Sequence, residues 1–218
     1  MLSLGASAIW STISLIRKLY QEGGLAQATA TLNRPLAEVP WLDLVSQLAS
    51  ICLALVPVLL ALYFLKQDEI DIGLKPKRSD IKQVVLVAAG VGIPGIGLYF
   101  LALELGLTAR VIPSALGDNW WTIPVLLLAA LKAGLLEEII AVGFFMTKLP
   151  RWKPELSIWA LILLSALFRA SYHSYQGFSA FFGNFVMGIV FAFWFYKTKR
   201  VAPVSYTHLR AHETPEHL

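Results

Sequence analysis

The chain has 218 residues, a formal net charge of +4 at pH 7, 57% hydrophobic residues and 15% charged residues. An ordinary soluble domain contains about 45–50% apolar and about 25% charged residues, so this composition argues against a soluble enzyme, a disordered chain and a nucleic-acid-binding protein. The single cysteine, Cys52, rules out an internal disulfide and a cysteine-rich metal site.

The N-terminal segment, residues 1–40, predicts a helix followed by a polar connection. One face of the helix is polar and the opposite face is apolar, carrying Ser7, Ser11, Ser14 and Lys18 against Ile9, Ile13, Ile16 and Tyr20. This pattern is typical of an amphipathic helix that lies in the membrane interface, and a short sixth membrane span is the alternative. Residues 23–40 contain two prolines and predict a connection at the surface.

Five membrane-spanning helices are expected after this segment. Residues 45–65, 84–103 and 178–196 carry no formal charge, and each has about the 20 apolar residues that a bilayer-spanning helix needs. Residues 122–149 and 156–173 are also apolar, apart from a few charged side chains. The predicted fold class is therefore all-α, a polytopic (multi-pass) helix bundle in the cell membrane.

Basic residues alternate between the connections of this bundle. Residues 66–82 carry five, and residues 148–153 and 197–200 carry three each, whereas residues 106–121 carry one and residues 174–177 carry none. Because cytoplasmic connections are enriched in Lys and Arg, the three basic connections are expected on the cytoplasmic side.

A glycine pattern in the second span imitates a nucleotide site. Gly90, Gly92 and Gly95 match the dinucleotide-binding fingerprint by letters, but that fingerprint works only between a strand and a helix N-terminus. Here it lies within an uncharged span that also contains Pro94. We expect a helix whose small residues allow close helix packing.

The bundle is expected to occupy residues 41–202, and the character of the chain changes after it. Residues 203–218 are polar and include His208, His212 and His217. This string resembles the translation of a sequencing-library adapter, so we expect it to be an artefact that replaces the true C-terminus. The alternative is a genuine short cytoplasmic tail.

Ionisable side chains gather in the two interrupted spans. Each costs about 2.5–3.5 kcal/mol at the centre of a membrane helix on insertion scales, so such residues persist when they are paired, hydrated or functional. They are Lys132, Glu137, Glu138, Arg169 and His173. Each of the two adjacent carboxylates opposes the ionisation of the other, and burial opposes the ionisation of both. A carboxyl group that holds its proton in this way suits a general base or a proton shuttle. Lys132 is interpreted as a counter-ion or a snorkelling residue.

Depth along the two helices predicts that these groups meet. At about 1.5 Å per residue, Glu137 lies about 20 Å from Pro150, and Arg169 lies about 20 Å from Leu156 on the next span. His173 shares a helical face with Arg169, about one turn further. In the last span, Asn184 could orient a partner or form a packing hydrogen bond.

Three sequence motifs resemble those of the CAAX prenyl-protease and bacteriocin-processing (CPBP, or Abi) intramembrane proteases. Residues 136–145, LEEIIAVGFF, resemble the first motif; residues 168–177, FRASYHSYQG, resemble the second; and residues 182–188, FGNFVMG, resemble the third. Two features depart from the family pattern. Val142 stands where the family usually has an arginine, which Arg169 could replace, and a last motif with a second histidine is not seen before the tail.

The resemblance implies peptide-bond hydrolysis within the bilayer, with a membrane-anchored peptide or protein as substrate. It implies that Glu137 activates water, that Glu138 partners it against Arg169, and that His173 binds water, the oxyanion or a metal. Asn184 is a supporting residue. The cofactor is either none or a divalent metal such as zinc, with Glu137 and His173 as candidate ligands.

Two other functions are compatible with the sequence. A catalytically inactive immunity or scaffold protein could use the same fold, and Val142 favours it slightly. A proton-coupled transporter could relay protons through the glutamates and His173, although such proteins usually show repeated halves. Membrane lipids are expected partners in every case, and nucleic acids are not.

Overall fold

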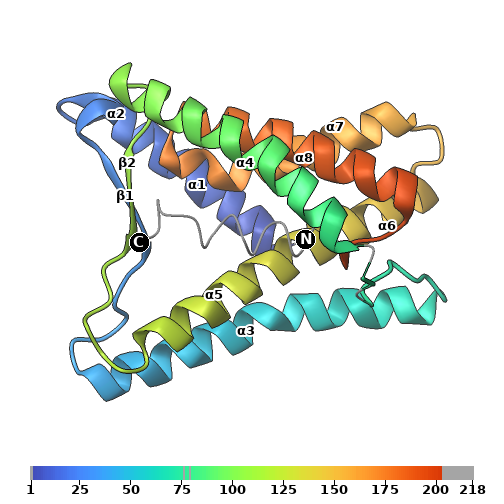
Figure 1. Ribbon diagram of the computed structural model, residues 1–218, viewed down its shortest axis with the longest axis horizontal. Helices are drawn as coiled ribbons and strands as arrows, with labels where there is room; N and C mark the ends of the chain where they lie inside the picture. Colours follow the sequence, from blue (N-terminus) through green and yellow to red (C-terminus); the bar gives the residue numbers. More distant parts are fainter. Residues whose placement is uncertain (1, 76, 79, 203–218) are drawn as a thin grey trace.

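The computed structural model describes residues 2–75, 77–78 and 80–202, and it is predominantly helical (Figure 1). The predicted adapter-derived tail, residues 203–218 with its three histidines, lies outside the described residues. The elements in chain order are α1 (Leu2–Tyr20), α2 (Gly24–Gln27), β1 (Thr29–Asn33), α3 (Pro40–Gln67), α4 (Asp80–Glu104), β2 (Arg110–Ser114), α5 (Thr122–Leu136), η1 (Glu137–Phe144), α6 (Phe145–Trp152), α7 (Ile158–His173), η2 (Ser174–Gln176) and α8 (Phe178–Thr198).

Three described helices are long and apolar enough to cross a membrane. They are α3, residues Val85–Glu104 of α4, and α8, and they contain the three uncharged spans predicted from sequence. The other two predicted spans do form helices, but their form differs. One is divided among α5, η1 and α6, and the other, α7, has 16 residues. The prediction of five spans is therefore confirmed for three of them.

The long helices run roughly along one direction and form two layers. In Figure 1, α1, α4, α7 and α8 lie together, α3 lies at the opposite side, and α5 runs beside α3 before the chain turns through η1 into the first group. The basic connections that follow α3 and α8, and the one around α6, lie at one end of the molecule (Figure 1). This arrangement agrees with the alternation of basic residues along the chain.

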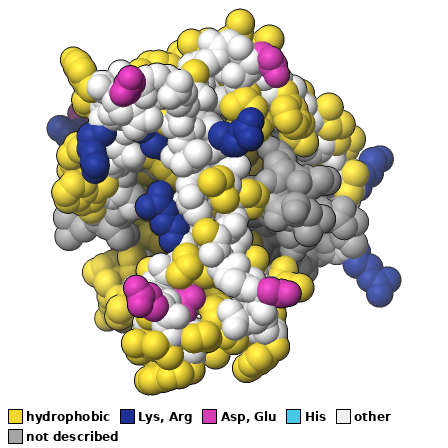
Figure 2. Space-filling view, turned by 90° about the vertical axis from the view of Figure 1, so that its left-hand side faces the viewer, with side chains coloured by type: hydrophobic (Ala, Val, Ile, Leu, Met, Phe, Trp, Pro, Cys, Tyr) yellow, Lys and Arg dark blue, Asp and Glu magenta, His cyan; other side chains and the backbone are white. Residues whose placement is uncertain are grey.

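A two-stranded parallel sheet, which the all-α prediction missed, closes the other end. β1 pairs with β2 from Thr29 opposite Arg110 to Asn33 opposite Ser114. In Figure 1 the two strands run side by side from the α1 and α4 layer to the α3 and α5 layer. Both strands lie in segments predicted as irregular connections, and five residues each were too few for a recognisable period of two. Figure 2 views this end, where apolar side chains lie over much of the described surface with Lys and Arg side chains among them.

Helix α1 has the predicted amphipathic pattern, but its polar face points inward. Ser11 is buried, its hydroxyl lies 3.1 Å from that of Ser174, and it accepts a hydrogen bond from the Tyr175 backbone N–H at 2.8 Å. Ile9 and Tyr20, on the apolar face, are exposed. The helix packs against α7 and η2. Ser11 therefore faces the protein interior and Ser14 is half-buried, whereas Ser7 is exposed, and the apolar side is left for lipid.

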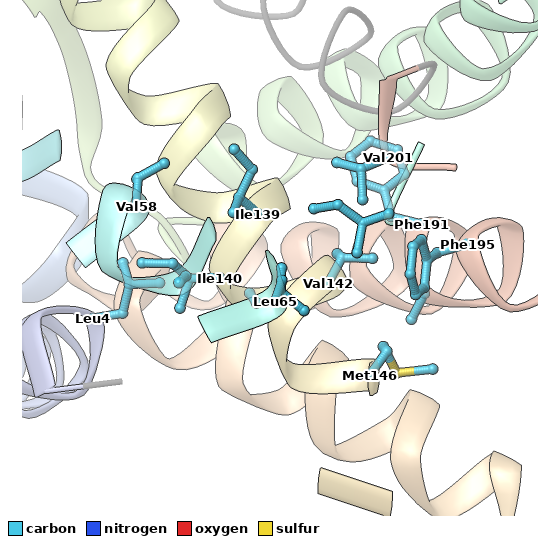
Figure 3. Packing of buried hydrophobic residues seen from close by; sticks show 14 of the residues in the cluster. Leu4, Val58, Leu65, Ile139, Ile140, Val142, Met146, Phe191, Phe195 and Val201 are labelled. Atoms are coloured by element: carbon cyan, nitrogen blue, oxygen red, sulfur yellow. The ribbon is translucent and has the colours of Figure 1, made fainter. Parts of the chain in front are cut away.

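The hydrophobic core surrounds η1. Ile139, Ile140 and Val142 are almost fully buried and belong to a cluster that joins α1, α3, α8 and the segment after α8 (Figure 3). The labelled neighbours in Figure 3 are Leu4, Val58, Leu65, Met146, Phe191, Phe195 and Val201. Apolar burial is worth about 25 cal/mol per Å², so this packing fixes the position of the two glutamates that open η1.

The glycine pattern of α4 is helical, as expected, but does not serve close packing. A Cβ atom placed on Gly90, Gly92 or Gly95 would meet no described atom within 4 Å. This helix is also the least covered of the three candidate spans. The expectation of close helix contact at these glycines is therefore wrong, because no described atom of another helix lies near any of the three positions.

Close packing instead occurs between α7 and α8, at Gly188. A Cβ on Gly188 would lie 2.7 Å from the Cα of Ala166, whereas a Cβ on Gly183 would lie 3.8 Å from the nearest Leu98 atom. We expect Gly188→Ala to lower the free energy of unfolding by about 1–3 kcal/mol through overpacking. Gly183→Ala is the matched control and should be neutral or slightly stabilising, since alanine favours a helix more than glycine does. Thermal unfolding in detergent micelles measures both, and equal effects would contradict the predicted contact.

Asp68 joins the end of α3 to α6. Its carboxylate lies 2.5 Å from Lys148 Nζ and also pairs with Arg151. The hydrogen bond from Lys148, helped by the charges of both bases, lowers the pKa of Asp68 below 3.8 despite partial burial. A lowered native pKa gives stability that is present above pH 3.8 and is lost as the pH falls through the native value. We expect Asp68→Asn to flatten the acid side of the stability-against-pH curve, measured by unfolding in micelles; an unchanged acid slope would contradict this.

Candidate active site

The two adjacent glutamates open a π-helix, a form that sequence reasoning did not predict. Residues Glu137–Phe144 adopt this wider helix within the continuous run from α5 to α6. Short π-helical segments arise where the backbone bonding pattern changes from i→i+4 to i→i+5, and they frequently occur at functional sites. Ser165 of α7 donates a 2.6 Å hydrogen bond to the carbonyl oxygen of Ala141. That bond provides a partner for a backbone group of η1 and ties it to the next helix.

Arg169 of α7 binds both glutamates. Its guanidinium nitrogens lie 2.7 Å from Glu138 Oε1 and 3.0 Å from Glu137 Oε2. The guanidinium also lies over the ring of Phe191 of α8, 4.9 Å from its centroid. A planar, five-donor cation suits this bridging role and stacks favourably on an aromatic face. The depth estimate from sequence, which placed Arg169 level with the glutamates, agrees with these contacts.

His173 completes the group, which we name the Glu–Arg–His cluster (Glu137, Glu138, Arg169 and His173). Its Nε2 lies 3.4 Å from Glu137 Oε2, at the long end of hydrogen-bond distance. Glu137 is therefore shared between Arg169 on one side and His173 on the other. The sequence placed His173 one turn beyond Arg169 on the same helical face, and the structure brings both to the same carboxylate.

Burial separates the roles of the two glutamates. Glu138 is 0% exposed and Arg169 is 1% exposed, whereas Glu137 is 6% exposed. The second carboxylate oxygen of Glu138, Oε2, has no hydrogen-bond partner among the described residues. Because Glu138 is sealed within the bundle, it can fix Arg169 but cannot meet a water molecule or a substrate from outside. Glu137 can meet both.

Two cavities reach the Glu–Arg–His cluster, and both are lined by Glu137 and His173. One, of about 270 Å³, lies beneath the β1–β2 ribbon and is also lined by Asn33 and Ser114. The other, of about 510 Å³, lies beside α1 and is lined by its serines, Ser7, Ser11 and Ser14. Lys132 and Tyr175 line both cavities as well. The accessible side of Glu137 thus stands where two hollows meet.

Three further sequence predictions have mixed outcomes. Asn184 does not join the cluster, because its Nδ2 donates a 2.9 Å hydrogen bond to Ala180 within α8; this bond stays within one helix and is not a packing bond between helices. Lys132 is half-buried and lines the cavities beside Glu137, whose charge attracts it, which fits the counter-ion interpretation better than a snorkelling lysine. Val142 is buried in the core, and the guanidinium comes from Arg169 on the neighbouring helix.

Sequence reasoning missed several residues that support the site. They are Ser165, Phe191, Tyr172 and the inward serines of α1. Ser165 and Tyr172 lie on α7 four residues before and three residues after Arg169, so the helical period could have placed them near its face. Nothing in the sequence distinguishes Phe191 from the other phenylalanines of α8.

The cluster offers few ligands for a metal ion. Within the described ranges, no group of three or more His, Cys, Asp or Glu side chains could hold a metal. Glu137 and His173 are close enough to contribute two ligands. Catalytic zinc sites use three protein ligands, so a further ligand would have to come from residues other than those described.

Comparison with known proteins gives one match. Residues 119–211 match the family model described as type II CAAX prenyl endopeptidase Rce1-like, a protease family, and this region contains the complete Glu–Arg–His cluster. Comparisons with curated proteins and with solved structures returned no match. With the apolar helices, the match indicates a membrane protein. The resemblance of this region to the CAAX prenyl endopeptidases, expected from its three motifs, is confirmed.

Proposed function

We propose that the protein is an intramembrane endopeptidase that hydrolyses membrane-associated peptides with a water molecule activated by Glu137. The observation that carries this proposal is the position of Glu137, which is bound by Arg169 and His173 yet accessible from two cavities. A carboxylate held in this way is suited to general-base catalysis, and the family match supports a protease.

The proposed reaction uses two groups of the Glu–Arg–His cluster, Glu137 and His173. Glu137 accepts a proton from water as the water oxygen attacks the peptide carbonyl carbon, and the carbonyl oxygen takes the negative charge. His173, which lines the same cavities, can donate a hydrogen bond to this oxygen. When the tetrahedral intermediate collapses, the C–N bond breaks and Glu137 returns its proton to the leaving amine. Glu138 holds Arg169 in place and takes no part in proton transfer.

The other candidate functions have less support. A proton relay needs a chain of accessible groups, but Glu138 is fully buried and bonded to Arg169. An inactive scaffold would not require cavities that converge on an accessible carboxylate. A metal could join Glu137 and His173 and polarise the substrate carbonyl, and zinc suits this ligand chemistry.

The decisive experiment measures cleavage by the protein in lipid vesicles. Membrane-anchored peptides, both with and without a prenylated cysteine, are incubated with the protein, and the products are identified by mass spectrometry. We expect a new N-terminus within the anchored peptide, and we expect His173→Ala to reduce the rate strongly. Cleavage that survives in His173→Ala would remove that residue from the mechanism, and proton flux without cleavage would favour the transporter.

A further inference from the structure

The end of α8 carries two lysines beside a row of aromatic rings. Lys197 Nζ lies 5.5 Å from the ring centroid of Phe193 and 5.7 Å from that of Tyr196. Lys199 Nζ lies 5.0 Å from the same Tyr196 centroid. Phe193 in turn stacks on Trp159 of α7, with ring centroids 6.0 Å apart. Two ammonium groups therefore share one ring, at the end of the molecule where Figure 1 shows the basic connections.

Neither lysine has an acidic partner within the described part of the chain. The next base, Arg200, lies 2.8 Å from Asp80. No described carboxylate forms an ion pair with Lys197 or Lys199, and both side chains are exposed. Their like charges repel each other, and each attracts an anion from outside. The end of α8 therefore presents positive charge that an external anion can neutralise.

The surface next to these lysines is apolar. Trp159 is 59% exposed, and Leu163, four residues further along α7, is exposed as well. On α8, Val186 lies seven residues before Phe193, so both belong to one exposed face. Trp and Tyr side chains collect where the hydrocarbon of a bilayer meets the headgroups. The aromatic rings therefore mark that level, and the lysine stems extend past them so that the ammonium groups reach the headgroups.

We propose that Lys197 and Lys199 bind the phosphate group of an anionic phospholipid whose acyl chains lie against Trp159 and Phe193. A phospholipid joins a negative group to long apolar chains, which matches a pair of cations at the end of an apolar surface. An acidic peptide or a soluble phosphate would match only the cations. Cytoplasmic connections are enriched in Lys and Arg, and the cytoplasmic leaflet contains anionic lipids that attract such residues. The basic end of the molecule is therefore expected to meet this leaflet.

A purely structural role for the two lysines makes a different prediction. Cations at the C-terminal end of a helix interact favourably with its dipole, and Lys197 lies in the last turn of α8. That interaction would stabilise the helix equally with every lipid. A bound phospholipid instead makes the stability depend on the headgroup, so the experiment varies the headgroup alone.

The test titrates the full chain, stripped of lipid in neutral detergent micelles, with phosphatidylglycerol or phosphatidylcholine of identical acyl chains. Native mass spectrometry measures the bound lipid, and thermal unfolding measures the stability of the same samples. We expect the parent to bind phosphatidylglycerol about tenfold more tightly than phosphatidylcholine and to gain stability as the site fills. Lys197→Met/Lys199→Met should reduce this preference to about twofold or less, because both cations are lost. Lys197→Arg/Lys199→Arg should keep it.

The matched control is Lys66→Met/Lys153→Met, which removes two other exposed cations from the connections at the basic end. It should leave the preference for phosphatidylglycerol unchanged. An equal loss of preference in this control would overturn the proposal in favour of a diffuse charge effect. A loss of stability in Lys197→Met/Lys199→Met that is the same with and without phosphatidylglycerol would leave only the helix-dipole role. Stabilisation of the parent by glycerol phosphate or a polyglutamate peptide as large as that by phosphatidylglycerol would also overturn the phospholipid assignment.

Discussion

Replacing Glu137 with glutamine is expected to reduce kcat by about 10²–10⁴-fold while leaving the fold intact. Removing a positioned general base typically costs this factor, and Glu137 is the carboxylate of the cluster that the cavities reach. Stability should not fall, because the variant leaves one carboxylate, Glu138, for the one guanidinium of Arg169. Single-turnover cleavage of a membrane-anchored peptide and thermal unfolding of the same sample measure the two quantities.

Glu138→Gln is the matched control for this experiment. It makes the same chemical change one residue away. The Glu138 side chain, however, is sealed from the cavities and lies 2.7 Å from Arg169. We expect Glu138→Gln to act mainly by lowering the free energy of unfolding. It should lower activity only because Arg169 is displaced. If Glu137→Gln retains near-parental kcat, Glu137 is not the base; if both variants lose activity and stability alike, the pair is structural.

The sequence was most informative where a charged residue, which is energetically costly within a membrane, lay in an otherwise apolar segment. Charges within hydrophobic spans singled out Glu137, Glu138, Arg169 and His173 without any structure. Counting the helical rise from the connection between two helices then placed Arg169 and the glutamates at one depth. This worked because consecutive antiparallel helices with a short connection have a fixed register.

The sequence was least informative where neighbours decide the structure. The π-helix needs a partner such as Ser165 and a surrounding core, neither of which appears in the local pattern of residues 137–144. The inward serine face of α1 shows the same limit. Amphipathicity identified the two faces correctly, but in a membrane the apolar side can face lipid and the polar side can face a cavity. The glycines of α4 predicted close packing against another helix. Among the described residues no atom lies near them, and only the structure could show this.

The second large effect is expected at Arg169. Arg169→Met should lower the free energy of unfolding by about 3–5 kcal/mol, because it leaves two carboxylates buried without their cation. This loss is a large part of the 5–15 kcal/mol that stabilises an ordinary protein. We therefore expect poor accumulation in the membrane, loss of cleavage and a much lower midpoint of thermal unfolding in micelles. Lysine at this position should rescue only part of the loss, since an ammonium cannot bridge both glutamates as the planar guanidinium does.

The double variant Glu138→Leu/Arg169→Met separates electrostatic from packing effects. Replacing a buried ion pair with apolar side chains of similar volume is often neutral or stabilising. Glu137 would then keep His173, 3.4 Å away, as its partner. We expect the double variant to recover at least half of the stability lost in Arg169→Met, although cleavage should stay low because Glu137 loses its second anchor. If the double variant is as unstable as Arg169→Met, the loss arises from packing against Phe191 and not from the unpaired carboxylates.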